Sequence, residues 1–255
     1  QDQFLLIMAK SGTPLDQLNE LPLPIARKAM AKLASLHATF WYTKDQEEAL
    51  YQQLHANGLI KTVAVHAYLG EFLVDPTKDY THDVYGMLED TKKQFAAKFA
   101  DYSEALHHFI SLRKLDKFEK NLRQLQADYQ SGELIRRIEK AHLLPESVNR
   151  TLVHADFRPD NFIVNANDEL IIVDYQGICF GNGGYDLAMF LAHSFEDQSH
   201  AEELLDLYWT DLLVNNPEIA KLYSKEQFMD DVKHSVLFHV IMLTFYCYTW
   251  RAMLD

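Results

Sequence analysis

Five polar residues that can do chemistry lie in one short stretch of the chain. The stretch holds His154, Asp156, Arg158 and Asn161 on one loop, and Asp174 at the end of the next apolar run. Phosphoryl transfer needs a base for an alcohol, oxygen ligands for magnesium and a cation for phosphate. The spacing His-x-Asp-x-x-x-x-Asn, followed by an Asp at a strand end, supplies all of these groups. The stretch therefore predicts a phosphotransferase site.

Three of these residues have roles that follow from their chemistry. Asp156 would accept the proton of the substrate hydroxyl and aim the hydroxyl oxygen at the γ-phosphorus. Asn161 offers a neutral oxygen and Asp174 a charged one to magnesium, a hard cation that prefers such ligands. Each could singly be an ordinary loop, turn or strand-end residue, but their joint spacing favours the functional interpretation.

The neighbouring polar residues leave alternatives open. Arg158 either neutralises charge on the transferred phosphoryl group or is an ordinary exposed arginine. For His154 we favour a structural role, holding the loop through hydrogen bonds, over metal binding or base catalysis. Asp186 either caps its own helix or braces the catalytic loop from behind. Gln176 either touches the metal shell or substrate, or is a plain loop residue.

Two short β-rich runs must position this site. Phe162–Val164 and Leu170–Val173 flank turn-forming residues at 165–168, a pattern that predicts a β-hairpin. The glycine-rich segment that follows, residues 177–184, is expected to be a flexible or tightly turned loop.

Helical periodicity covers most of the remaining chain. A helix is expected after Pro24, and the stretch from about Thr81 to Lys140 is helical with charges outside. Ser224 and Gln227 form a capping-box pattern ahead of a long final helix. Two further helices are expected at Tyr185–Phe195 and Ala201–Val214. The fold class is α+β and mostly helical, with the catalytic groups flanking a small hairpin.

Composition limits the classes of function. The chain has 255 residues, of which 48% are hydrophobic, and a formal net charge of −13. That acidity disfavours nucleic acid as a partner, because phosphate binding needs clustered Lys and Arg. The two cysteines form no disulfide or zinc pattern, so a reduced, cytoplasmic compartment is expected. The most apolar late stretch, Val236–Trp250, is too short to predict a membrane span.

The residues around the predicted site resemble the protein-kinase-like superfamily. The run His154–Asn161 looks like its catalytic loop, and Asp174-Tyr175-Gln176 stands where that superfamily has Asp-Phe-Gly. Within it, the chain is most similar to the aminoglycoside phosphotransferase-like branch, and there to the ecdysteroid-kinase-like and choline-kinase-like enzymes of small molecules. Three further runs carry this resemblance, namely Leu36–Trp41, Tyr185–Leu191 and Tyr223–Phe228.

The resemblance implies the C-terminal lobe of a protein-kinase-like fold. Residues 1–10 would be the end of an N-terminal-lobe strand and the hinge. Residues 11–255 would be the helical C-terminal lobe, with the catalytic loop and metal site at 152–186. The implied activity is ATP- and Mg²⁺-dependent transfer of the γ-phosphate to a hydroxyl of a small molecule. The adenine of ATP would bind hinge backbone near Met8, Ala9 and Lys10.

One departure from that family opens alternatives. Its small lobe carries a phosphate-covering loop and a nucleotide-binding lysine, and neither has a place before Phe4. We therefore expect this chain to be a truncated form, the C-terminal part of a longer kinase. The second interpretation is a non-catalytic, kinase-like binding module. The third is a metal-dependent hydrolase using His154, Asp156 and Asp174.

No motif specifies the acceptor alcohol. Aromatic residues of the later helices would suit a hydrophobic alcohol such as a steroid, or a quaternary amine through cation–π contact. Core packing explains the same residues equally well, so both interpretations stay open. These residues include Tyr208, Trp209, Tyr246 and Trp250.

Overall fold

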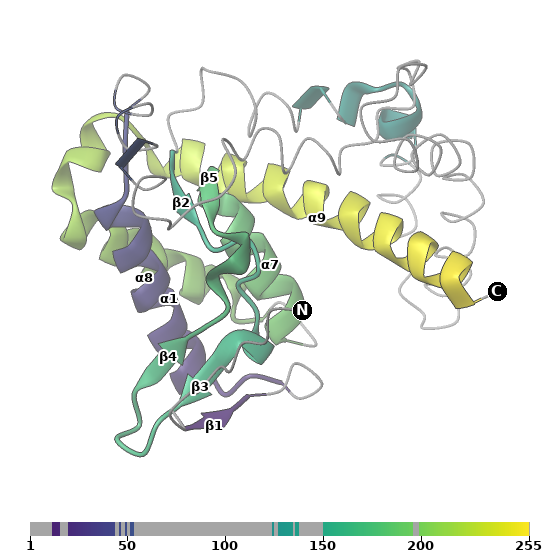
Figure 1. Ribbon diagram of the computed structural model, residues 1–255. Coiled ribbons are helices and arrows are strands. Elements are labelled where there is room, and N and C mark those ends of the chain that lie inside the picture. Colours follow the sequence, from purple (N-terminus) through teal and green to yellow (C-terminus); the bar gives the residue numbers. More distant parts are fainter. Residues whose placement is uncertain are drawn as a thin grey trace.

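The structure is a computed structural model of the chain. It describes residues 12–15, 20–43, 150–195 and 199–254, with scattered positions between 46 and 53 and between 124 and 137. Side chains are described as far as residue 239. This part is a mostly helical α+β arrangement with two small antiparallel sheets, which confirms the predicted class (Figure 1).

Helix α1 (Leu23–Thr39) begins at a pair of prolines. Pro22 precedes it and Pro24 lies in its first turn, where a missing N–H breaks no helical bond. One face of the helix is buried against α8 (Ala201–Asn215) in the main core. The buried face consists of Ala26, Ala29, Met30, Leu33, Ala34, His37 and Ala38. The last turn of α1 therefore carries a histidine into the core.

The predicted hairpin forms most of the larger sheet. Strands β3 (Phe162–Val164) and β4 (Leu170–Ile172) pair antiparallel, with Ile163 opposite Ile171. This pairing confirms the hairpin predicted from the two β-rich runs and the turn residues between them. Strand β1 (Thr13–Pro14) adds an edge to β3, and the sequence pattern does not indicate this short strand.

The second sheet corrects one expectation. Cys179–Gly181 lie inside the segment expected to be a loop, but they form strand β5, which pairs antiparallel with β2 (Thr151–Val153). Every residue of both strands is buried, and Leu152 pairs with Phe180. Burial of the apolar side chains and the ladder bonds outweigh the weak strand preference of the flanking glycines.

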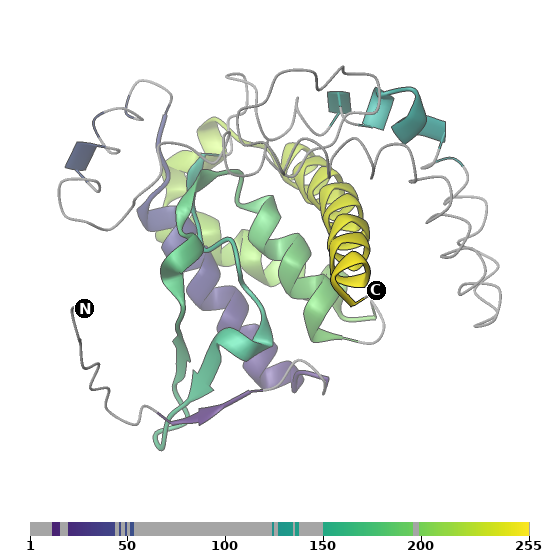
Figure 2. The same cartoon turned by 45° about the vertical axis from the view of Figure 1, so that its right-hand side comes forward.

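Helices α7 (Gly184–Ser194) and α9 (Lys225–Leu254) complete the described part. As Figures 1 and 2 show, α7 lies between the hairpin and the first half of α9. The predicted capping box is confirmed at the start of α9. Ser224 N–H donates to Gln227 Oε1 at 2.8 Å, and Gln227 N–H donates to Ser224 Oγ at 3.2 Å. Among the described helices, none combines the length and apolar character that crossing a membrane requires.

Aromatic side chains fill the core between α8 and α9. Tyr208 stacks on Phe228 with ring centroids 5.6 Å apart, and Trp209 stacks on the same ring at 5.2 Å. Tyr208 is only 1% exposed. Core packing therefore accounts for these two residues, while the side chains of Tyr246 and Trp250 lie outside the described part.

Candidate active site

The predicted base lies in the loop between β2 and β3. The Asp156 side chain is half-buried, and both of its oxygens have partners in the chain. Asn161 Nδ2 donates to Asp156 Oδ2 at 2.8 Å, and Arg158 Nε lies 2.8 Å from Asp156 Oδ1. The structure thus brings three predicted site residues into direct contact and holds the carboxylate in one orientation.

Asn161 joins the base to the hairpin. It ends the short 3-10 helix Pro159–Asn161 and is 7% exposed. Its Nδ2 also donates to the backbone oxygen of Asp156 at 2.8 Å, and its own backbone oxygen accepts the N–H of Val173 at 3.0 Å. Because the amide nitrogen is engaged, the side-chain oxygen Oδ1 is the atom that could ligate a cation.

Asp174 follows the hairpin directly and is exposed. Gln176 Nε2 donates to its Oδ2 at 3.4 Å, so Gln176 touches a predicted metal ligand. The described residues contain no group of three or more His, Cys, Asp or Glu that could hold a metal ion. Magnesium needs only one or two carboxylates and fills its shell with water and phosphate. Asn161 accepts the backbone N–H of Val173, the residue before Asp174, so this bond holds the two predicted ligand residues close along the backbone. The side-chain oxygens of Asn161 and Asp174 fit that requirement.

Asp186 braces the catalytic loop. It lies in the first turn of α7 and is 0% exposed. Its Oδ2 accepts the N–H of His154 at 2.7 Å, and its Oδ1 accepts the N–H of Ala155 at 2.9 Å. The N-cap of α7 is Gly183, with no side-chain capping bond. Of the two alternatives, bracing is therefore confirmed and capping is wrong.

Two non-glycine residues at the site have left-handed backbones. Ala155 has φ 65° and Asp174 has φ 63°. This conformation costs an L-residue about 1–2 kcal/mol, so the surroundings must impose it. For Ala155 the surroundings include the bonds that Asp186 accepts from its N–H and that of His154. Ala155 immediately precedes Asp156, and the second strained residue is Asp174 itself.

His154 has the structural role that the sequence favours. Its Nε2 donates to the backbone oxygen of Val173 at 2.9 Å, and its Nδ1 accepts the N–H of Asp156 at 3.3 Å. Its ring packs on Tyr175 with centroids 4.6 Å apart. Burial, followed by the charge of Asp186, raises the pKa of Tyr175. The His154 ring thus links the backbone oxygen of Val173, the residue before Asp174, to the backbone N–H of the predicted base Asp156.

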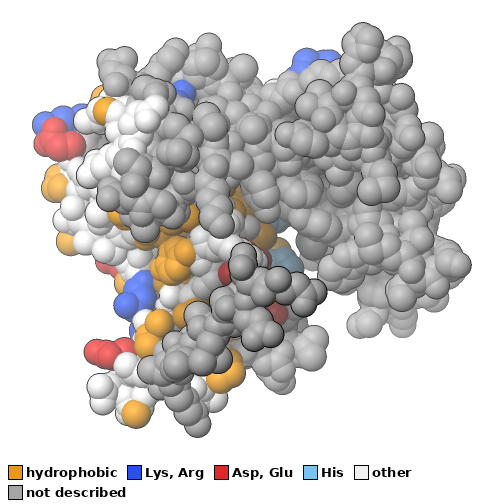
Figure 3. Space-filling model, in the orientation of Figure 1, with side chains coloured by type: hydrophobic (Ala, Val, Ile, Leu, Met, Phe, Trp, Pro, Cys, Tyr) orange, Lys and Arg blue, Asp and Glu red, His pale blue; other side chains and the backbone are white. Residues whose placement is uncertain are grey.

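The Arg158 guanidinium forms ion pairs with two carboxylates. Besides Asp156 it contacts Asp160, with Nη1 3.4 Å from Asp160 Oδ2. The charges of the same groups also shift the pKa of the half-buried His193 of α7. Burial and then Arg158 lower the pKa of His193, while Asp156 and Asp160 raise it. Histidine and acidic side chains lie together near the middle of the face in Figure 3.

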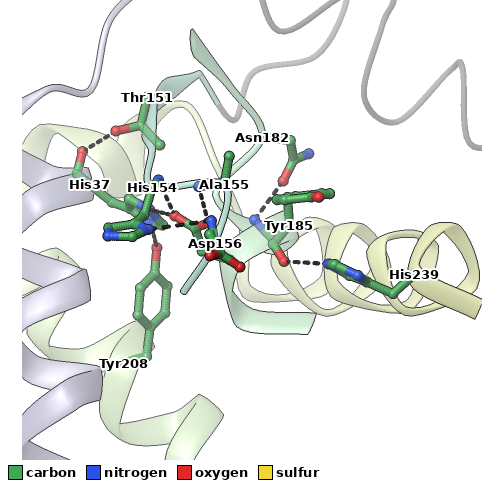
Figure 4. A network of polar contacts seen from close by, with 11 residues as sticks. His37, Thr151, His154, Ala155, Asp156, Asn182, Tyr185, Tyr208 and His239 are labelled. Atoms are coloured by element: carbon green, nitrogen blue, oxygen red, sulfur yellow. Dashed lines mark hydrogen bonds and ion pairs between the residues drawn. The ribbon is translucent and has the colours of Figure 1, made fainter. Parts of the chain in front are cut away.

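A buried polar chain behind the loop is the main feature that sequence reasoning missed. Tyr208 Oη lies 2.7 Å from His37 Nδ1, and His37 Nε2 lies 3.2 Å from Asp186 Oδ2 (Figure 4). Thr151 Oγ1 donates to the backbone oxygen of His37 at 2.8 Å. The only available signal is a polar residue on an otherwise apolar helix face, at His37. Its partners are too distant in the sequence for a local pattern to reveal.

The predicted adenine-binding residues Met8, Ala9 and Lys10 lie outside the described residues. So do the strand end and hinge expected at residues 1–10 and most of the helical stretch expected at 81–140.

Comparison with known proteins identifies the family. A sequence profile of the ecdysteroid kinase-like family matches residues 13–220, so the chain belongs to that family. No curated protein matches the chain. Among solved structures, it is similar to a crystal structure of an aminoglycoside-3'-phosphotransferase of type VIII. The identity is 14% and the TM-score 0.42, over 91% of this chain and 66% of that one.

Membership of the family confirms the family resemblance that the motifs indicate. The chain spans 66% of the length of the aminoglycoside phosphotransferase, slightly less than two thirds.

Proposed function

We propose that the protein transfers the γ-phosphate of ATP to a hydroxyl of a small molecule. The observation that carries the proposal is the Asp156 carboxylate, which is gripped on Oδ2 by Asn161 and on Oδ1 by Arg158, each at 2.8 Å. A carboxylate fixed in this way can accept a proton from an alcohol without first reorganising.

In this mechanism Asp156 accepts the hydroxyl proton as the alcohol oxygen attacks the γ-phosphorus and the bond to ADP breaks. Arg158 is the cation nearest to the base in the described loop. Its guanidinium, which contacts Asp156 and Asp160 here, would offset negative charge on the transferred group.

Asn161 and Asp174 would hold magnesium, through the amide Oδ1 and the carboxylate. Bound there, the ion would neutralise charge on the nucleotide phosphates. Adenine would bind backbone near Met8, Ala9 and Lys10. We also propose a cytoplasmic location, since the cysteine pattern favours a reduced compartment.

The family name and the aromatic residues suggest which alcohols to test as acceptors. The name of the family points to a polyhydroxylated steroid, and the aromatic content of the last helix is compatible with an apolar alcohol. Tyr208 and Trp209 lend this no support, because they pack in the core. A test panel should therefore include an ecdysteroid, choline and an aminoglycoside.

The test is to incubate the full-length protein with ATP, Mg²⁺ and each alcohol, and to follow ADP and the phosphorylated product. We expect product from at least one alcohol. Asp156→Asn should lower turnover at least a thousandfold while preserving nucleotide affinity. Asp168→Asn is the matched control, because it makes the same change at an exposed turn of the hairpin.

Three other outcomes would contradict the proposal. Nucleotide binding without turnover would indicate a binding module. Release of inorganic phosphate alone, with every alcohol, would indicate a hydrolase. Turnover that survives in Asp156→Asn would remove Asp156 from the role of base.

A further inference from the structure

The polar chain behind the catalytic loop joins three helices. Tyr208 comes from α8, His37 from the last turn of α1, and Asp186 from the first turn of α7. All three side chains are at most 1% exposed. Buried polar groups that satisfy one another in series act as a unit, because the loss of one leaves its neighbour unpaired.

The backbone geometry accommodates this junction. A Cβ at Gly183 would lie 2.7 Å from His37 Nδ1, closer than real side-chain atoms approach. The glycine therefore lets the start of α7 close onto the imidazole. Thr151 of β2 fixes the same turn of α1 by donating to the backbone oxygen of His37 at 2.8 Å.

The hydrogen-bond directions follow from the partners. In the part of the chain that the structure describes, the Tyr208 hydroxyl has His37 as its hydrogen-bond partner. A buried hydroxyl that only accepted would leave its own proton without a partner, which is unfavourable. Tyr208 therefore donates to Nδ1, which leaves the imidazole proton on Nε2. His37 Nε2–H then donates to Asp186 Oδ2 at 3.2 Å.

The chain ends on the backbone of the catalytic loop. Asp186 accepts the N–H groups of His154 and Ala155, and Ala155 holds the left-handed conformation that directs the chain into Asp156. Figure 4 shows Tyr208 and His37 on one side of this junction, with Ala155 and Asp156 beyond it.

We propose that Tyr208 and His37 are positioning residues for phosphoryl transfer: Tyr208 selects the His37 tautomer that anchors Asp186, and Asp186 holds the loop that aims Asp156. The catalytic part of this inference rests on the proposed function. The structural part concerns the hydrogen bonds that lead from α8 through α1 and α7 to the loop, and it does not depend on activity. A substitution on α8 should therefore change how Asp156 is positioned, although neither Tyr208 nor His37 contacts Asp156.

The decisive variant is Tyr208→Phe, with Tyr223→Phe as its matched control. Tyr223 is also buried in the α8–α9 core and also loses one hydroxyl bond, to Asp231 Oδ2 at 2.6 Å, which is not part of the chain Tyr208–His37–Asp186. With MgATP and the panel alcohol of highest turnover, we expect Tyr208→Phe to lower kcat about three- to tenfold, with KM values within twofold. Tyr223→Phe should leave kcat within twofold of wild type.

A second pair of variants tests the donor at His37. His37→Gln keeps an N–H that can reach toward Asp186, whereas His37→Leu removes it. Retention of kcat within about threefold by Gln, against a loss of tenfold or more by Leu, is expected if the donor is what matters. Equal losses in both variants would mean that His37 acts through packing and would overturn its positioning role.

Two measurements need no activity. In full-length protein labelled with ¹⁵N-histidine, His37 should show a protonated Nε2 and an unprotonated Nδ1. Hydrogen exchange at the His154 and Ala155 amides should be about three- to tenfold faster in Tyr208→Phe than in Tyr223→Phe. An inactive wild type would refute the proposed function alone, and these readouts would still decide the structural part. A proton on Nδ1, or unchanged amide exchange, would overturn the inference.

Discussion

The two flanks of the catalytic hairpin are held in different ways. Before the hairpin, the backbone N–H groups of His154 and Ala155 are bonded to the buried Asp186, and both oxygens of Asp156 have partners. After the hairpin, the Asp174 carboxylate is exposed, and its described partner is Gln176 at 3.4 Å. Both flanks nevertheless contain a left-handed residue that is not glycine, at Ala155 and Asp174.

The difference fits the two chemical tasks that we propose for Asp156 and Asp174. A base must be aligned before the alcohol arrives, because misplacement by even 1 Å slows the reaction. A metal ligand can adopt its final geometry together with the ion and the nucleotide phosphates. The buried polar groups are therefore concentrated on the flank that carries Asp156, and the flank that carries Asp174 is accessible. Changes on the first flank should affect folding, and changes on the second should affect metal binding.

The largest effect on stability is expected from Asp186→Ala. It leaves the N–H groups of His154 and Ala155 and the Nε2 of His37 without their acceptor inside the protein. Each unpaired buried donor costs about 1–3 kcal/mol, so the free energy of unfolding should fall by about 3–5 kcal/mol. Urea denaturation would measure this loss. Asp206→Ala, at a residue whose side chain is 53% exposed, should change stability by less than about 0.5 kcal/mol. Similar losses for both would break the comparison.

The next effect is a pH dependence from His239. Its Nε2 donates to the backbone oxygen of Tyr185, adjacent to Asp186, at 3.1 Å. Burial, reinforced by His193, lowers its pKa to about 4, although the bond to Tyr185 and the charge of Asp186 oppose the shift. Between pH 4 and the ordinary histidine pKa of about 6.5, only the unfolded chain binds the proton. Its contribution to stability is thus complete above that window and is lost as the pH falls through it.

The loss over this window should be about 3 kcal/mol. His239→Gln keeps a donor for Tyr185 but cannot titrate, so its stability should fall less between pH 6.5 and 4. Thermal denaturation of both proteins across these pH values checks the prediction. An identical pH profile for the variant would show that His239 is not the group responsible.

The smallest effect on stability is expected from Asp174→Asn. Asparagine tolerates the left-handed backbone, and the side chain is exposed, so the unfolding free energy should change by less than about 0.5 kcal/mol. The affinity for Mg²⁺ in the presence of ADP should nevertheless fall about tenfold or more, because a charged ligand is lost. Asp168→Asn, also left-handed and exposed, controls for the substitution and should bind Mg²⁺ as wild type does. Unchanged Mg²⁺ affinity in Asp174→Asn would contradict the division between the flanks.

Local patterns in the sequence predicted much of this fold. The hairpin, the capping box of Ser224 and Gln227, and helices α7 and α8 depend on neighbouring residues, so their spacing is visible in the chain. Strand β5 was hidden, because its glycine-flanked residues become a strand only by pairing with β2. That pairing is a tertiary contact, and local propensity does not encode it.

The candidate site divides in the same way. The residues that would do chemistry lie within one loop and one strand end, so their spacing is visible in the sequence. The choice between bracing and capping by Asp186 needed the structure, because a helix-opening Asp suits both. The bonds of His37 to Tyr208 and Asp186 were not predicted, since each joins residues more than a hundred positions apart.

The central claim is that Asp156, held by this network, takes the proton from an alcohol while the γ-phosphate moves to that alcohol. The most direct measurement is ³¹P NMR of a single turnover, with full-length protein in excess over MgATP and in the presence of the alcohol. We predict that the γ-phosphate signal converts to a phosphomonoester in wild type and Asp168→Asn, and that it persists in Asp156→Asn with ATP still bound. A phosphomonoester formed at the wild-type rate by Asp156→Asn, or inorganic phosphate as the sole product, would contradict the account.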